Sequence, residues 1–85
     1  MRRHQLEIIA DILQAAKRGT NKTRIMYRAD VNFKQTQKYL GKLMEKGLLT
    51  ETKHERKKLF QISDKGLEYL HKYNELKELL TIGDQ

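Results

Sequence analysis

The residues best suited to contact a partner lie in NFKQTQKYLGKLMEKGLL, residues 32–49, whose spacing predicts one helix. Its outward positions carry cations and amides: Lys34, Gln35, Gln37, Lys38 and Lys42. No acidic residue comes before Glu45, although surface helices usually mix Glu with Lys because pairs of opposite charge stabilise them. Glutamine can bond adenine in a bidentate way, and lysine can bond the acceptors of guanine. The candidate base-reading residues are therefore Lys34, Gln35, Gln37 and Lys38.

Each feature of this face also has a plainer explanation. The face can be a solvated basic helix, and Gln35 can be used up in a capping box with the Asn32 amide. For Phe33, packing under the turn is favoured over contact with a thymine methyl group. Gly41 costs a helix about 1 kcal/mol relative to alanine, which suggests close approach of another helix.

A second group of basic and polar residues is suited to phosphates. The segment KHERKK, residues 53–58, places five basic residues around one glutamate, and further candidates flank the first three predicted helices. The candidate backbone contacts are Arg2, Arg3, Lys22, Arg24, Arg28, Asn32, Lys42, Lys53, His54, Arg56, Lys57 and Lys58.

The charge distribution supports a polyanionic partner. Residues 1–62 hold 15 Lys/Arg and 6 Asp/Glu, which gives +9, whereas residues 63–85 hold 3 Lys and 5 Asp/Glu, which gives −2. A concentrated positive field attracts nucleic acid. The alternative is a basic protein whose charge serves only its solubility.

Periodicity and capping residues divide the chain into elements. Apolar residues at helical spacing predict a first helix over His4–Lys17 that ends with Gly19 in the C′ position. Thr20 or Asn21 caps a second helix over Lys22–Ala29, and Asn32 caps a third that Gly47 stops. Leu48–Thr52 and Leu59–Ser63 predict two strands around a charged tip.

Ser63 or Asp64 caps a last helix, Lys65–Leu80, in which Leu67 and Leu70 are expected to close the core. A stripe at spacings of four, three and four residues is typical of a partner helix, most simply a second copy of the chain. The stripe, and hence the candidate dimer interface, is Tyr69, Tyr73, Leu76 and Leu80. The alternative is that this helix folds back on the first.

This order predicts a mainly α (α+β) protein, a winged helix-turn-helix with a two-stranded wing. The third helix is expected to enter the major groove of double-stranded DNA and the wing to lie against the backbone. The chain has no cysteine, scattered histidines, no glycine-rich phosphate loop and no clustered carboxylates, so we expect no enzyme, metal, cofactor or small-molecule ligand. No segment is apolar enough to span a membrane and no signal peptide is evident, so we expect a cytoplasmic, nucleoid-associated protein.

The segments KTRIMYRADVNFKQTQKYLGKLMEKGLL and FQISDKGLEYL add a resemblance. The chain resembles the small archaeal winged-helix DNA-binding proteins that dimerise through a C-terminal antiparallel coiled coil. The resemblance implies a homodimeric regulator or chromatin-associated protein, with recognition helix Phe33–Lys46, wing Lys53–Lys58 and dimer helix Lys65–Leu80. Residues 1–63 would form the DNA-binding domain and residues 64–85 the dimerisation helix, although a tail ending at Gln85 is short for that family.

Three functions are compatible with this sequence. A sequence-specific transcriptional regulator is the leading hypothesis, and a non-specific architectural protein is its nearest alternative. A winged helix that docks proteins is a third, and it requires an exposed apolar patch on the third helix or the wing.

Overall fold

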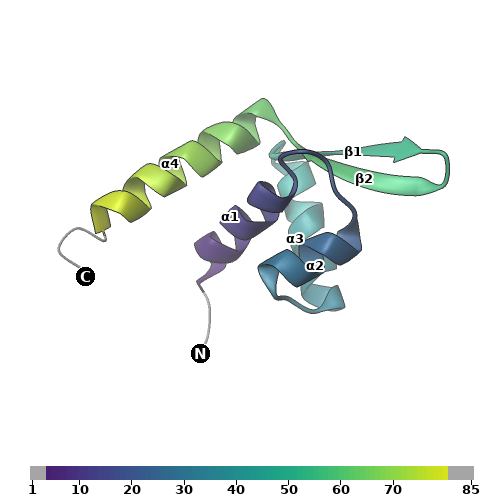
Figure 1. Cartoon of the computed structure of the whole chain (residues 1–85), viewed down its shortest axis with the longest axis horizontal. Coiled ribbons are helices and arrows are strands. Elements are labelled where there is room, and N and C mark those ends of the chain that lie inside the picture. The colour runs from purple at the N-terminus through teal and green to yellow at the C-terminus, as the bar shows by residue number, and fades with distance from the viewer. Residues whose placement is uncertain (1–3, 81–85) are drawn as a thin grey trace.

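The computed structural model describes residues 4–80, which form four helices and one two-stranded antiparallel sheet (Figure 1). The elements are α1 (Gln5–Ala15), α2 (Lys22–Ala29), α3 (Phe33–Glu45), β1 (Leu49–His54), β2 (Lys57–Ile62) and α4 (Asp64–Leu80). This mostly helical order, with a hairpin directly after the third helix, is a winged helix-turn-helix. It confirms the fold class predicted from the sequence.

The core lies between α1, α2, α3 and the base of the wing. Its most completely buried large side chains are Ile12 and Leu13 of α1, Ile25 of α2 and Thr36 of α3. Burial of such apolar surface is the main term that favours folding, at about 25 cal/mol per Å². The outward residues of α3 are therefore held on a helix whose inner face is fixed.

The caps that begin α2 and α4 and the glycine that ends α3 are those predicted from the sequence. Asn21 caps α2 by accepting from the Arg24 amide at 2.9 Å, and Ser63 caps α4 by accepting from the Gly66 amide at 3.0 Å. Gly47, at a φ of +75°, ends α3, and the following Leu48 amide donates back to the Leu43 carbonyl at 2.8 Å. This is the Schellman arrangement, in which a glycine accepts the left-handed conformation without steric cost.

The first helix ends earlier than the sequence predicts. It stops at Ala15 rather than Lys17, and Gly19, at a φ of +82°, lies in the turn beyond rather than at C′. The carbonyl of Ala16 accepts from Gly19 at 3.2 Å and from Ile62 of β2 at 2.9 Å. The tertiary bond to β2 ends the helix, which local sequence does not reveal.

The wing strands are also longer than predicted and lie nearer the tip. They run over Leu49–His54 and Lys57–Ile62, with His54 opposite Lys57, so Glu55 and Arg56 alone form the turn. Residues 50–58 are all exposed. Their strand structure depends on cross-strand pairing rather than on burial, so hydrophobic alternation does not indicate it.

The last helix is only partly attached to the body. Leu70 is buried, whereas Leu67, expected in the core, is 41% exposed, and Leu76, Leu79 and Leu80 are also exposed. Figure 1 shows α4 and the wing extending from the body in opposite directions, and the molecule measures 49 Å along its longest axis.

Candidate nucleic-acid interface

The start of α3 is fixed by a complete capping box. Asn32 Oδ1 accepts from the backbone N–H of Gln35 at 2.7 Å, and Gln35 Oε1 accepts from the backbone N–H of Asn32 at 3.3 Å. Such a box satisfies two backbone donors that would otherwise lack partners. The structure thus shows the capping role that the sequence left open for Gln35, with its side-chain NH2 group still exposed.

A contact between α2 and α3 holds a second glutamine. Lys22 donates from Nζ to Gln37 Oε1 at 2.7 Å, and the same ammonium group lies 4.7 Å from the centroid of the Phe33 ring. Phe33 is 55% exposed, so the expectation that it packs under the turn is wrong. An ammonium group over an aromatic face is attracted by the ring quadrupole, and this attraction stabilises the contact between Lys22 and the exposed Phe33 ring.

The outward face of α3 is continuous, and the structure exposes every cation predicted on it. Lys34, Gln35, Gln37, Lys38 and Lys42 are all exposed, and Glu45 is the first acidic residue of the helix. Gly41 lies among them on this face.

A Cβ atom built at Gly41 meets nothing within 4 Å. The predicted close approach of another helix is therefore wrong within this chain, because α3 turns Gly41 outward instead of toward α1 or α2. Its low helix propensity is not offset by packing within the protein.

The wing places basic side chains opposite one another, an arrangement that does not stabilise a two-stranded sheet. Lys53 lies directly opposite Lys58, and His54 lies opposite Lys57. The directly opposed ammonium groups of Lys53 and Lys58 destabilise the sheet. One acidic neighbour reduces this repulsion, because Glu51 lies 3.5 Å from Lys58 Nζ. Surface ion pairs of this kind contribute little, so the wing keeps a strong positive field.

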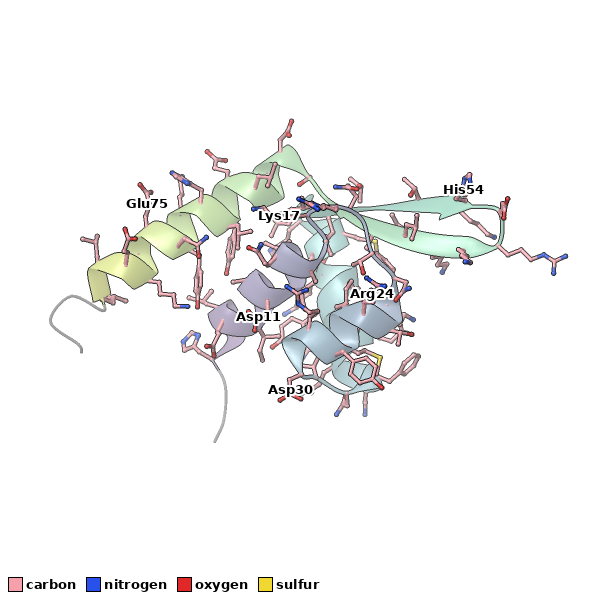
Figure 2. The ribbon with its side chains drawn as sticks, in the orientation of Figure 1. Asp11, Lys17, Arg24, Asp30, His54 and Glu75 are labelled. Carbon is pink, nitrogen blue, oxygen red and sulfur yellow. The ribbon has the colours of Figure 1, made fainter. Side chains whose placement is uncertain are left out.

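The basic residues of α2 divide between two sides of that helix. Lys22 contacts α3, whereas Arg24 and Arg28 line a hollow of about 570 Å³ on the side toward the end of α1. Lys17 and Arg18 line the same hollow, and no acidic residue does. Figure 2 shows Lys17 and Arg24 near the base of the wing and His54 far out on it.

Sequence reasoning missed Lys17 and Arg18 as candidates, because cations are common at the end of a helix, where they interact favourably with its dipole. A signal was present, since Lys17-Arg18-Gly19 is a pair of cations before a glycine turn. Arg2 and Arg3 lie outside the described residues.

An apolar groove separates the start of α1 from the outer half of α4. Its volume is about 390 Å³, and its lining includes Leu6 of α1 with Tyr73, Leu76 and Leu80 of α4. Tyr69 borders the adjoining apolar surface, and its hydroxyl is buried with no hydrogen-bond partner within residues 4–80. Desolvation by burial raises the Tyr69 pKa above its usual value, and the neighbouring Tyr73 raises it further.

The described residues contain neither a cluster of metal ligands nor a membrane-spanning helix. Within residues 4–80, no three His, Cys, Asp or Glu side chains come together as a metal site would require. None of the helices in that range combines the length and apolarity needed to cross a membrane.

The chain is similar in sequence to a family of known proteins. A family model described as winged helix-turn-helix matches residues 2–81. A protein of Methanocaldococcus jannaschii is 31% identical over 81 residues, which cover 94% of this chain and 79% of that protein.

Solved structures resemble this one over most of its length. Sso10a-2, a DNA-binding protein from Sulfolobus solfataricus, is 28% identical with a TM-score of 0.81, covering 95% of this chain and 88% of that one. The transcriptional regulator BldR, also from Sulfolobus solfataricus, is 22% identical with a TM-score of 0.79. That match covers 92% of this chain and 61% of BldR. Because the two sequences are only 22% identical, it shows the fold alone.

Proposed function

The chain belongs to the winged helix-turn-helix family, and from this premise we propose that it binds double-stranded DNA as a homodimeric regulator. In this proposal α3 lies in a major groove and the wing lies along the phosphate backbone. The observation that carries it is the exposed face of α3, where cations and amides continue from Lys34 to Lys42 without an acidic residue. Sso10a-2, which has the same fold over nearly the whole chain, is a DNA-binding protein.

The residues divide into two proposed roles. Lys34, Gln35, Gln37 and Lys38 face base edges, because a recognition helix meets bases near its N-terminus. Phosphates are contacted by residues of the wing, of α2 and of the basic hollow, to which the structure adds two cations missed in the sequence. These residues are Lys17, Arg18, Lys22, Arg24, Arg28, Lys42, Lys53, His54, Arg56, Lys57 and Lys58.

The exposed apolar surface of α4 and the start of α1 supports the proposal that a second copy of the chain binds there. Leu76, Leu79 and Leu80 are 52%, 66% and 74% exposed, and Leu6 adds 45% from the opposite side of the groove. Apolar side chains gathered in this way mark an interaction site rather than ordinary surface. We propose that α4 of a second copy covers them, with Tyr69 and Tyr73 at the inner edge.

The same distribution weighs against a protein-docking role for α3. Among the described residues, Phe33 is the one large apolar side chain exposed on α3, and it is paired with Lys22. The wing exposes none. Apart from Phe33 and Tyr27 of α2, the exposed large apolar side chains of residues 4–80 all lie on α1 and α4.

Titration of specific and random duplexes at two salt concentrations tests the proposal. If the α3 face reads bases, Gln37→Ala lowers the ratio of specific to random affinity. Arg56→Ala weakens every duplex alike and reduces the salt slope by about 0.9, the value for one lost phosphate contact. Lys72→Ala, which removes a cation from α4, is the matched control and leaves both quantities unchanged.

An architectural protein that coats DNA is the second candidate, favoured by the cations of the hollow and the wing. It predicts a specificity ratio near one for the wild type and an equal loss on all sequences for Gln37→Ala. Absence of duplex binding even in dilute salt rejects both candidates.

Sedimentation tests the dimer. Leu76→Glu with Leu80→Glu places two charges in the proposed interface, so we expect a monomer where the wild type sediments as a dimer. Asn74→Glu adds a charge on the opposite side of α4 and leaves the dimer intact. A monomeric wild type, at concentrations where duplexes are bound, contradicts the homodimer.

A further inference from the structure

The polar side chains at the start of α3 have their oxygens occupied by donors. Asn32 Oδ1 accepts from the backbone N–H of Gln35, and Gln35 Oε1 accepts from the backbone N–H of Asn32. Gln37 Oε1 accepts from Lys22 Nζ. The buried Thr36 hydroxyl donates to the Asn32 carbonyl at 2.8 Å. Within residues 32–37, each side-chain amide oxygen is therefore directed at a donor of the protein itself, and one of its two lone pairs is engaged there.

The orientation of both glutamine amides follows from chemistry. Side-chain oxygen and nitrogen are hard to tell apart by shape, so their placement depends on their partners. A backbone N–H group and a lysine ammonium group can only donate, so the group facing each of them must be an oxygen. The NH2 groups of Gln35 and Gln37 remain, and both residues are exposed.

The outward face is consequently a row of donors. Lys34 and Lys38 contribute ammonium groups, which have no acceptor, and the two glutamines contribute amide NH2 groups. In the major groove guanine presents two acceptors, N7 and O6, whereas adenine presents an acceptor beside an amino donor and cytosine presents an amino donor. A donor row is complementary to guanine and meets an unfavourable amino group on adenine or cytosine.

We propose that α3 selects duplexes with guanine at the bases it faces, and that Lys22 sets this preference by holding the Gln37 oxygen. The proposal rests on the DNA-binding function proposed above. It revises the sequence-based expectation of glutamine on adenine, because bidentate reading of adenine needs the amide oxygen that Lys22 engages at 2.7 Å.

Lys22 is suited to this positioning role by its surroundings. Its side chain is half-buried, and the Phe33 ring lies 4.7 Å from its ammonium group. The exposed ring thus keeps Lys22 over α3 and beside Gln37. Arg24 and Arg28, on the other side of α2, line the basic hollow instead.

Selection from a pool of duplexes with a randomised segment tests the preference directly. We expect guanine enriched at the contacted positions, and replacement of one such guanine by adenine lowers affinity about tenfold or more. Inosine, which keeps N7 and O6, preserves binding, whereas 7-deazaguanine, which lacks N7, weakens it. Enrichment of adenine at those positions, or equal binding of the 7-deazaguanine duplex, overturns the proposal.

Lys22 variants test the positioning role. Lys22→Met keeps the apolar stem and frees the Gln37 oxygen, so the ratio of guanine to adenine affinity falls toward one. Lys22→Arg still donates to that oxygen and retains the wild-type ratio. Arg28→Met removes the same charge from the other side of α2, so it weakens all duplexes without changing the ratio.

The outcomes separate this inference from the function beneath it. If no duplex binds, the DNA-binding proposal fails. If duplexes bind with no base preference, DNA binding stands and guanine selection is rejected. If the ratio is the same in wild type, Lys22→Met and Lys22→Arg, all with unchanged thermal unfolding, the role of Lys22 is rejected.

Discussion

Replacement of Gly41 by alanine separates the stability of α3 from its proposed use. Glycine in a helix interior costs about 1 kcal/mol relative to alanine, and a Cβ atom at Gly41 meets nothing within 4 Å in this chain. We therefore expect the free energy of unfolding to rise by about 1 kcal/mol. For a domain of this size that corresponds to an increase in Tm of roughly 4–8 °C.

Duplex binding is expected to change in the opposite direction. Gly41 lies on the exposed face that carries Lys38 and Lys42, so an added methyl group stands between α3 and the groove. Hydrogen bonds to base edges tolerate only a few tenths of an ångström. We expect affinity for duplex DNA to fall about tenfold, which is ~1.4 kcal/mol.

Thermal unfolding and duplex titration of the same preparation provide the measurement. Asn74→Ala is the control, because it also introduces the better helix former but on α4, away from α3. It should raise Tm without altering DNA affinity. A Gly41→Ala variant that is less stable than wild type refutes the open space around Gly41. A variant whose duplex affinity equals that of wild type refutes the close approach of α3 to the groove.

Three further predictions concern stability. Gly66→Ala should lower the free energy of unfolding by about 2 kcal/mol or more, because its Cβ would overlap the Leu48 carbonyl oxygen and lie 2.6 Å from an Ile62 carbon; urea unfolding measures this, and an unchanged midpoint would contradict the packing at the start of α4. Asn32→Ala should cost about 1 kcal/mol through loss of the α3 cap, whereas Asn32→Asp, which can still accept from the Gln35 amide, should retain most of that stability. Tyr69 has a raised pKa, so its contribution to stability is fully present below pH 10, the usual value, and is lost as the pH rises through the folded-state pKa. Ultraviolet titration of the folded protein should show a phenol that ionises above pH 10, and that step should be missing from Tyr69→Phe.

The parts of the fold that sequence alone predicts are those set by neighbouring residues. Asn32 and Gln35 form a capping box from a spacing of three, and Gly47 ends α3 because it accepts a positive φ. Phe33 and Gly41 were misjudged because their environment depends on how α2 and α3 pack, which periodicity does not specify. Long-range contacts decide such positions.

The candidate interface divides in the same way. The α3 face follows from helical spacing, so its residues could be chosen from the sequence, although their base contacts stay a prediction. The contact between Lys22 and Gln37 joins residues 15 positions apart, and the basic hollow joins α1 to α2. Which oxygen is engaged, and which cations share a surface, emerges only from the tertiary arrangement.

The attachment of the wing determines how it can move. Phe60 exchanges two backbone hydrogen bonds with Thr20, at 2.7 and 2.9 Å, and Ile62 donates to Ala16, so β2 is tied to the link between α1 and α2. Between Phe60 and the tip the hairpin has no buried side chain, because residues 50–58 are exposed and Leu59 is half-buried. We therefore expect the hairpin to bend about its anchored root, with the largest displacement at the turn formed by Glu55 and Arg56. In the proposed complex, such bending would let the wing follow duplexes whose groove widths differ from one sequence to the next.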